Sequence, residues 1–132
     1  GDFWINNILF KYDEDGRPIA SKVLDFQMSR IGHPTSDILY FLFTSTTSEM
    51  RKNYLKNWLK YYYDTLMRDL ANLNSEVTED VYTWEEFLKD CKQRSLRWMV
   101  YSGMVMGMVL NKKLADELDV MHQQKSNCSC SF

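Results

Sequence analysis

The chain has 132 residues, of which 45% are hydrophobic and 14% aromatic, and a formal net charge of -2. This length and composition exclude an intrinsically disordered protein and predict one domain with a hydrophobic core. The near-neutral charge argues against a general nucleic-acid-binding protein and against a protein that binds anionic membrane surfaces.

The sequence predicts a soluble, cytoplasmic protein. No apolar run approaches the roughly 18 residues that span a bilayer, and the first residues lack the basic and apolar regions of a signal peptide. The three cysteines (Cys91, Cys128 and Cys130) are too few and wrongly spaced for a secreted disulfide framework. Cys128, Cys130 and His122 also lack the spacing of a zinc site.

The first predicted element is a β-hairpin. Ile5–Tyr12 is a β-prone run, Asp13–Gly16 is rich in turn-forming residues, and Pro18–Phe26 resumes an apolar, β-branched pattern. The acidic turn lacks the third ligand and the later glutamate of an EF-hand loop, so we interpret it as a plain turn.

A short buried helix is predicted after the irregular segment Met28–Thr35. Thr35 or Ser36 is a suitable N-cap, and Asp37 lies in the first turn, where the helix dipole favours an anion. The apolar run Ile38–Phe43 then completes the helix.

Two longer helices follow. Glu49–Leu70 has apolar residues at helical spacing, which predicts an amphipathic helix. Thr83 and Glu86 form the capping-box pattern that begins a second helix. The run Met99–Leu110 in that helix is almost wholly apolar, which predicts burial on most sides. Gly103 and Gly107 within it permit the close approach of another backbone.

These elements predict an α+β fold, in which a hairpin precedes a mainly helical bundle. We expect residues 1–120 to form the domain and residues 121–132 to form a disordered polar tail. The sequence shows no internal repeat and no second core.

Three polar side chains near the start suggest phosphoryl transfer. Asp2 and Asn7 are spaced Asp-x-x-x-x-Asn, and Asp25 returns to them across the hairpin. Phosphoryl transfer uses one carboxylate near the attacking hydroxyl, and a second carboxylate with an amide oxygen to hold magnesium on the nucleotide phosphates. Such hard oxygen ligands suit Mg²⁺.

The residues that carry this pattern resemble a known family. The stretches GDFWINNILF (residues 1–10) and LDFQMSRIGHPTSDILYFL (residues 24–42) are similar to the ecdysteroid-kinase-like (CHK-kinase-like) family, relatives of choline kinases and aminoglycoside phosphotransferases. The resemblance is dense over residues 1–43. It implies the C-terminal lobe of a protein-kinase-like fold that uses ATP and Mg²⁺ to phosphorylate a small-molecule hydroxyl, with an ecdysteroid or a related alcohol as the leading candidate.

The resemblance also implies residue roles. Asp2 matches the aspartate that engages the substrate hydroxyl, and Asn7 and Asp25 match the magnesium ligands. Gln27 stands where other kinases have the glycine of Asp-Phe-Gly. Asp37 matches a helix-start aspartate that supports the catalytic loop, although an aspartate is common in a first helical turn for structural reasons alone.

Parts of the family pattern are missing. The histidine that precedes the family's Gly-Asp is absent, as is the N-terminal lobe with its glycine-rich loop and phosphate-contacting lysine. The chain also opens without an initiator methionine. We therefore expect an N-terminally cut sequence whose partner is the missing lobe of the same enzyme, and which is inactive alone.

Several other side chains have two possible roles. Trp4, Trp98, Tyr101 and Met104 either line an acceptor pocket or belong to the core. Arg30 and His33 lie in the segment that corresponds to a kinase activation segment. Arg30 either meets an anionic group there or has a solvated surface role.

Two functional hypotheses remain. The first is an ATP-dependent small-molecule kinase, with no nucleic-acid or membrane partner. The second is a non-catalytic, truncated kinase relative that acts as a helical interaction module. A protein kinase is disfavoured, because the segment between Asp25 and Asp37 is short for a peptide-docking platform.

Overall fold

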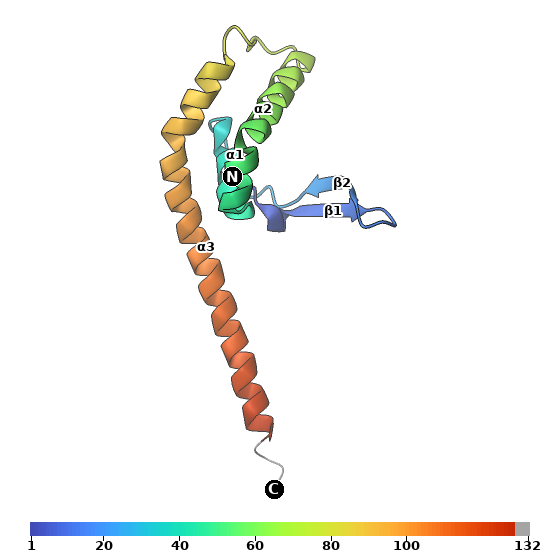
Figure 1. The fold of residues 1–132 in the computed structure, drawn as a ribbon, viewed down its shortest axis with the longest axis vertical. Coiled ribbons are helices and arrows are strands. Elements are labelled where there is room, and N and C mark those ends of the chain that lie inside the picture. The colour runs from blue at the N-terminus through green and yellow to red at the C-terminus, as the bar shows by residue number, and fades with distance from the viewer. Residues whose placement is uncertain (129–132) are drawn as a thin grey trace.

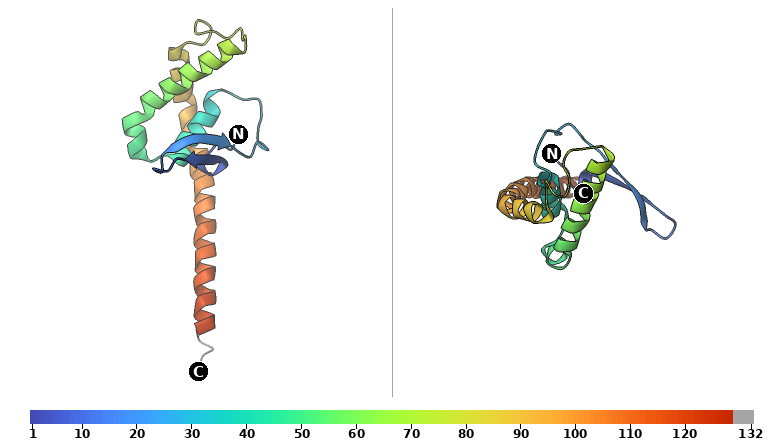
Figure 2. Two further views of the ribbon diagram at one scale, coloured as in Figure 1. Left: turned by 90° about the vertical axis from the view of Figure 1, so that its right-hand side faces the viewer. Right: turned by 90° about the horizontal axis from the view of Figure 1, so that it is seen from above.

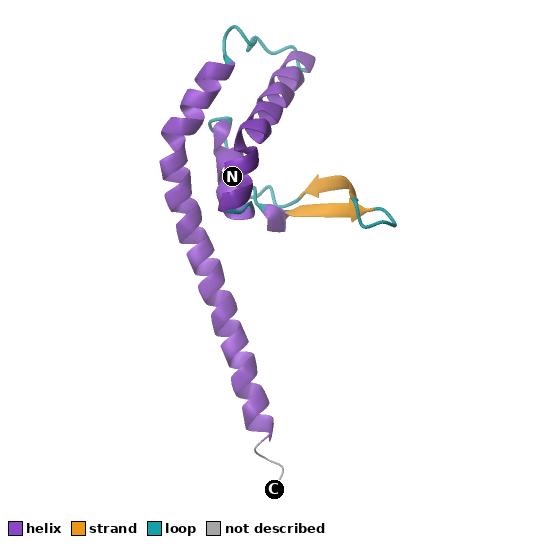
Figure 3. Cartoon of the chain, viewed as in Figure 1, coloured by secondary structure: helices purple, strands orange, loops and turns teal. Residues whose placement is uncertain are grey.

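The computed structural model describes residues 1–128 and has the predicted α+β architecture (Figure 1). Helices dominate it, and the only strands of the described residues form one antiparallel hairpin (Figure 3). The elements in chain order are the 3₁₀ helix η1 (Ile5–Asn7), β1 (Ile8–Tyr12), β2 (Pro18–Val23), α1 (Thr35–Ser45), α2 (Ser48–Asn72) and α3 (Trp84–Cys128).

The hairpin forms where the sequence predicted it. Ile8 pairs with Val23 and Lys11 with Ala20, and the register then shifts so that Tyr12 pairs with Pro18. At the turn, Asp13 Oδ1 accepts backbone N–H groups from Asp15 (3.0 Å) and Arg17 (2.8 Å). This side-chain-to-backbone bonding is typical of a turn aspartate, which agrees with the plain-turn interpretation.

The hairpin extends sideways from the helices, so it is largely solvent-exposed (Figure 1). All residues of β2 are exposed, and so are all residues of β1 except Ile8. Leu9, Tyr12 and Ile19 are each more than half exposed, at 55%, 56% and 57%. A two-stranded hairpin with uncovered apolar side chains is at best marginally stable by itself, so its attachment to the helices matters.

Helix α1 begins at Thr35, which was itself predicted, with Ser36, as a possible N-cap. Thr35 and Ser36 lie inside the first turn, Pro34 occupies the N-cap position, and no side chain caps the helix. The Thr35 hydroxyl instead lies 2.9 Å from Nδ1 of His33. The predicted cap is therefore wrong, because the hydroxyl of buried Thr35 is engaged by a neighbouring imidazole.

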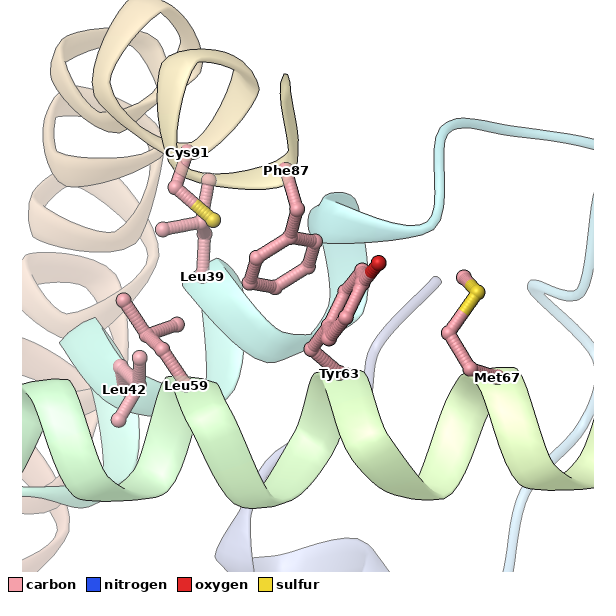
Figure 4. Packing of buried hydrophobic residues seen from close by; sticks show 7 residues of the cluster. All are labelled: Leu39, Leu42, Leu59, Tyr63, Met67, Phe87 and Cys91. Carbon is pink, nitrogen blue, oxygen red and sulfur yellow. The ribbon is translucent and has the colours of Figure 1, made fainter. Parts of the chain in front are cut away.

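The core lies where α1, α2 and the first part of α3 meet. Phe87 on α3 is fully buried and stacks against Tyr62 and Trp84. The Tyr63 hydroxyl donates a 2.7 Å hydrogen bond to the Tyr82 carbonyl, which satisfies its polar end. The buried members of this cluster are Leu39, Leu42, Leu59, Tyr63, Met67, Phe87 and Cys91 (Figure 4).

The capping box at the start of α3 is confirmed. The Glu86 amide donates to Thr83 Oγ1 at 3.2 Å, and the Glu86 carboxylate accepts from the Thr83 amide at 3.0 Å. Two backbone N–H groups at the helix start are thus satisfied reciprocally, which fixes where the helix begins.

The second part of α3 differs from the prediction. Figure 2 shows the helix continuing well beyond the other elements. Met104 and Met108 are 58% and 67% exposed, and a Cβ at Gly103 or Gly107 would meet nothing within 4 Å. Burial of Met99–Leu110 on most sides and a close backbone at the two glycines were therefore wrong, because the described residues cover only one side of this run. Ser102 on that side is 1% exposed, whereas Val100 and Leu110 are 54% and 59% exposed.

The structure also differs from the predicted disordered tail. Helix α3 runs through Cys128, so residues 121–128 are helical, and residues 129–132 lie outside the described part. Extending an existing helix avoids the costly nucleation step, and Gln123, Gln124 and Lys125 are good helix formers. No helix in the described part is long and apolar enough to cross a membrane.

Candidate active site

The loop between Gly1 and Asn7 closes on itself through one carboxamide. The 3₁₀ helix η1 turns the chain so that Asn7 Nδ2 donates to the Asp2 carbonyl at 2.9 Å and to Asp2 Oδ2 at 3.2 Å. Asp2 itself has φ of 73°, in the left-handed region that is sparsely populated by residues other than glycine. The five-residue spacing thus does bring the two polar groups together.

A second donor to Asp2 comes from Tyr40 on α1, a residue that the sequence did not indicate as part of the site. The Tyr40 hydroxyl donates to Asp2 Oδ1 at 3.1 Å, and the tyrosine is only 2% exposed. Burial, this hydrogen bond and the negative charge of Asp2 together raise the pKa of Tyr40 above its usual value. The phenol therefore stays protonated and keeps donating through the neutral range. A lone hydroxyl within the apolar run Ile38–Phe43 was the available signal.

One face of α1 supports the loop at several points. The nitrogen of Gly1 lies 3.1 Å from Asp37 Oδ1, the Phe3 and Phe41 rings are 5.3 Å apart, and Ser45 Oγ accepts from the Ile5 amide at 2.9 Å. The three α1 positions are spaced by four residues, so they lie along one helix face. Asp37 is therefore placed beside the loop, and its supporting role stays a prediction.

The hairpin brings Leu24, the residue before Asp25, to Asn7. Ile8 pairs with Val23, and the Leu24 amide then donates to the backbone carbonyl of Asn7 at 2.8 Å. Asp25 follows directly after this bonded residue. Asp25 has φ of 60°, and its Oδ2 accepts from Gln27 Nε2 at 3.3 Å. A hydrogen bond between the side chains of Asp25 and Gln27 thus stabilises the turn of the backbone at Asp25.

The donor chemistry of Asn7 and Asp25 fits Mg²⁺. Asn7 directs its side-chain NH₂ group to Asp2, and its side-chain Oδ1 accepts no hydrogen bond within the described residues. This oxygen and the Asp25 carboxylate are hard ligands, and Mg²⁺ in phosphoryl-transfer sites takes its other ligands from water and substrate phosphates. Among residues 1–128 there is no group of three or more His, Cys, Asp or Glu placed to hold a metal ion.

An aromatic hollow of about 280 Å³ opens beside Asp2. Tyr40, Trp98 and Tyr101 form a mutually packed trio, with ring centroids 5.7 to 5.9 Å apart. We call the hollow the Asp2 hollow; it is lined by Gly1, Asp2, Met28, Arg30, Tyr40, Trp98, Tyr101 and Val105. Two of the candidate acceptor-pocket residues, Trp98 and Tyr101, are therefore beside the carboxylate.

The other two candidates lie elsewhere. Met104 lines an adjoining hollow together with Trp98 and Tyr101. Trp4 lines neither hollow; it is half-buried, and its indole N–H has no hydrogen-bond partner within the described residues.

A separate apolar hollow of about 430 Å³ lies between the three helices and contains none of Asp2, Asn7 and Asp25. It borders the core cluster at Leu39, Leu59 and Cys91. The chemistry suggested by the carboxylates is thus confined to the other face of α1.

The segment before α1 is tied to α3 through a histidine. His33 Nε2 lies 3.0 Å from Asp90 Oδ2, and the Tyr82 hydroxyl donates to the same oxygen at 3.0 Å. The Thr35 amide donates to His33 Nδ1 at 3.3 Å, and the Tyr62 hydroxyl donates to the Pro34 carbonyl at 2.6 Å. His33 is thus not free in solvent: its imidazole contacts the Asp90 carboxylate and anchors this segment to α3.

Comparison with known proteins identifies one family. The model of the ecdysteroid kinase-like family matches residues 1–75, which is more than half of the chain. The matched part contains Asp2, Asn7, Asp25, Asp37 and Tyr40. Neither curated proteins nor solved structures yielded a match.

Proposed function

Because the chain belongs to the ecdysteroid kinase-like family, we propose that it serves an ATP-dependent phosphotransferase that phosphorylates a hydroxyl group of a small molecule. One observation carries the proposal. Asp2 receives one donor on each carboxylate oxygen, from Asn7 and from Tyr40, and it faces a hollow with aromatic walls. A fixed carboxylate beside a cavity is what positioning a hydroxyl nucleophile requires.

In the proposed reaction, Asp2 orients the acceptor hydroxyl and accepts its proton. Each carboxylate oxygen has lone pairs left after one hydrogen bond, so the two donors hold the group without blocking it. The donors also restrict rotation of the carboxylate, which keeps it near the attacking oxygen. The protein thus acts mainly by positioning.

Asn7 and Asp25 would hold Mg²⁺ through their oxygens. When bound, the ion neutralises charge on the nucleotide phosphates. The chain's part is to present the amide oxygen beside the carboxylate, which the Asn7–Asp2 hydrogen bond and the Leu24–Asn7 ladder bond both support.

The hollow favours an apolar, ring-containing alcohol as acceptor. Trp98 and Tyr101 present flat apolar surfaces, while Asp2 is the only carboxylate among the lining residues. Ligand sites of this kind combine apolar walls with a few placed polar groups. An ecdysteroid or a related alcohol is the leading candidate.

A complete enzyme would add an N-terminal lobe that contacts the nucleotide from the other side. The exposed hairpin supports this proposal, because Leu9, Phe10 and Ile19 leave apolar surface uncovered on the two strands that connect Asn7 to Asp25. We also propose that the protein works in the cytoplasm, where ATP and Mg²⁺ are present.

The test is a phosphoryl-transfer assay on the full-length protein that contains this chain, with labelled ATP and a panel of steroid, choline and aminoglycoside acceptors. We expect Mg²⁺-dependent labelling of a steroid-like alcohol. Asp25→Ala should abolish Mg²⁺-dependent nucleotide binding measured by calorimetry, whereas Asp15→Ala, at the exposed hairpin turn, should leave it unchanged. Unaltered Mg-nucleotide affinity in Asp25→Ala would contradict the metal role.

The exposed part of α3 favours a second candidate, a non-catalytic interaction module. Its apolar side chains Val100, Met104, Met108 and Leu110 are each more than half exposed, a pattern seen at protein-contact surfaces. The transcript upstream of Gly1 separates the two candidates. A histidine followed by a lobe with a strand lysine would support the enzyme, and an in-frame stop would support the module.

A further inference from the structure

Two arginines meet in a second hollow that adjoins the Asp2 hollow. This hollow, of about 280 Å³, is lined by Arg30, Arg97, Trp98, Val100, Tyr101 and Met104. Arg30 comes from the segment before α1 and Arg97 from α3, so the two cations are brought together by tertiary structure and not by sequence proximity. No carboxylate lines the hollow.

Neither arginine has an anionic partner within residues 1–128. Arg17 and Arg68, in contrast, lie 3.6 Å from Asp15 and 3.2 Å from Asp69. Arg30 and Arg97 make no ion pair and donate no side-chain hydrogen bond to any described residue, although the whole chain carries a net charge of -2. Two unpaired guanidinium groups at one hollow concentrate positive charge where an anion can reach both.

The two hollows are continuous in their lining. They share Arg30, Trp98 and Tyr101, and Asp2 lines only the first. A ligand that places a hydroxyl at Asp2 and lies along the aromatic rings therefore extends to the arginines. An anion would avoid the Asp2 end, because like charges repel, and would favour the arginine end.

Arg30 belongs to an anchored segment. The Ser29 amide donates to the Phe26 carbonyl at 2.9 Å, and three residues after Arg30 the imidazole of His33 is held by Asp90 at 3.0 Å. These contacts on both sides of Arg30 restrict the position of its backbone. Less conformational entropy is therefore lost when the side chain binds an anion.

We propose that Arg30 and Arg97 form an anion subsite at the far end of the acceptor cleft, and that the acceptor is an apolar ring alcohol that also carries a carboxylate or sulfate. The planar guanidinium group matches the two oxygens of such an anion, and it forms stronger hydrogen bonds to an anion than to a neutral group. This proposal rests on the proposed function in one respect, which is that the Asp2 hollow binds the acceptor.

The test uses cholate, an alicyclic ring system with hydroxyl groups and a carboxylate, and its neutral methyl ester. Binding to the full-length protein is measured by calorimetry without nucleotide, below the concentration at which cholate forms micelles. We expect cholate to bind about tenfold more tightly than methyl cholate, because only cholate offers a charge-assisted hydrogen bond. Raising the salt concentration should reduce this ratio.

Arg30→Gln and Arg97→Gln should each bring the ratio close to one without changing the melting temperature, since both side chains are exposed. Arg68→Gln, on the exposed surface of α2, is the matched control and should keep the ratio. Equal affinities for the two probes, no binding of cholate, or a ratio unaffected by both arginine variants would overturn the subsite.

Two further outcomes keep the subsite and the enzymatic function distinguishable. If Arg30→Gln weakens binding of Mg-ATP and leaves the cholate ratio intact, the arginine serves the nucleotide and the subsite is refuted. If the arginine-dependent ratio is present but no acceptor is phosphorylated, the subsite stands and the kinase function fails.

Discussion

The two faces of α1 perform different tasks. On one face Leu39 and Leu42 are buried in the core with α2 and α3. On the other, Tyr40 and Asp37 contact the loop that carries Asp2. The same short helix therefore joins a region held by apolar packing to a region held by a few hydrogen bonds.

This difference predicts that stability and activity can be altered separately. Packing energy is spread over many contacts and falls whenever a cavity is made. The Asp2 site depends on the placement of individual polar atoms, whose loss changes the reaction far more than the fold. Variants on the two sides of α1 test this separation.

The largest effect is expected from Asp2→Asn. The amide keeps the size of the side chain but cannot accept the acceptor's proton, so turnover should fall about 10²- to 10⁴-fold while nucleotide affinity stays nearly constant. Steady-state kinetics and nucleotide titration of the full-length enzyme provide the measurement. Asp15→Asn, 70% exposed at the hairpin turn, is the control. Wild-type turnover in Asp2→Asn would refute the catalytic role.

Phe87→Ala tests the core. Phe87 is fully buried against Tyr62, Tyr63 and Trp84, so truncation should lower the free energy of unfolding by about 3–5 kcal/mol. Met108→Ala, in the exposed part of the same helix, should change it by less than about 0.5 kcal/mol. Urea denaturation followed by circular dichroism measures both. Similar losses in the two variants would show that the far part of α3 is buried in solution.

Cys91 predicts a pH dependence of stability. Burial, and to a lesser extent the charge of Asp90, raises the pKa of the Cys91 thiol from 9.0 to about 11. The unfolded thiol ionises first, so its stabilising contribution is complete below pH 9 and is lost as the pH rises toward 11, by about 2 kcal/mol in all.

Cys91→Ala provides the comparison for this effect. Tyrosines with raised pKa values, such as Tyr62, act in the same direction, so the test is the difference in unfolding free energy between wild type and Cys91→Ala in reducing buffer. That difference should shrink between pH 9 and pH 11. A constant difference would mean that the thiol is accessible to solvent.

Local patterns predicted the parts of the fold that depend on neighbours in sequence. The turn at Asp13, the Thr83–Glu86 capping box and the Asp2–Asn7 contact each involve residues within five positions. Their physical causes operate within one turn or one loop, so spacing and residue type are enough.

Long-range partners were not predictable in the same way. Tyr40 contacts Asp2 across 38 positions, and the lone hydroxyl in the run Ile38–Phe43 does not by itself show which distant group it contacts. The apolar run Met99–Leu110 shows a surface that gains from burial, but not whether a partner is present to bury it. The predicted N-cap of α1 was wrong because the Thr35 hydroxyl contacts the His33 imidazole and not a backbone N–H group at the helix start.

Tyr40→Phe is the smallest change and the one that addresses α1 most directly. It removes only the hydroxyl, so one oxygen of Asp2 loses its donor while the packing against Trp98 and Tyr101 stays. We expect kcat to fall about tenfold, in line with the loss of one hydrogen bond to a charged group, and the free energy of unfolding to change by less than about 1 kcal/mol. Tyr61→Phe, at a side chain that is 75% exposed, should alter neither quantity. If Tyr40→Phe instead lowers stability and activity in parallel, the two faces of α1 are not separable, and the hydroxyl serves the fold as much as the site.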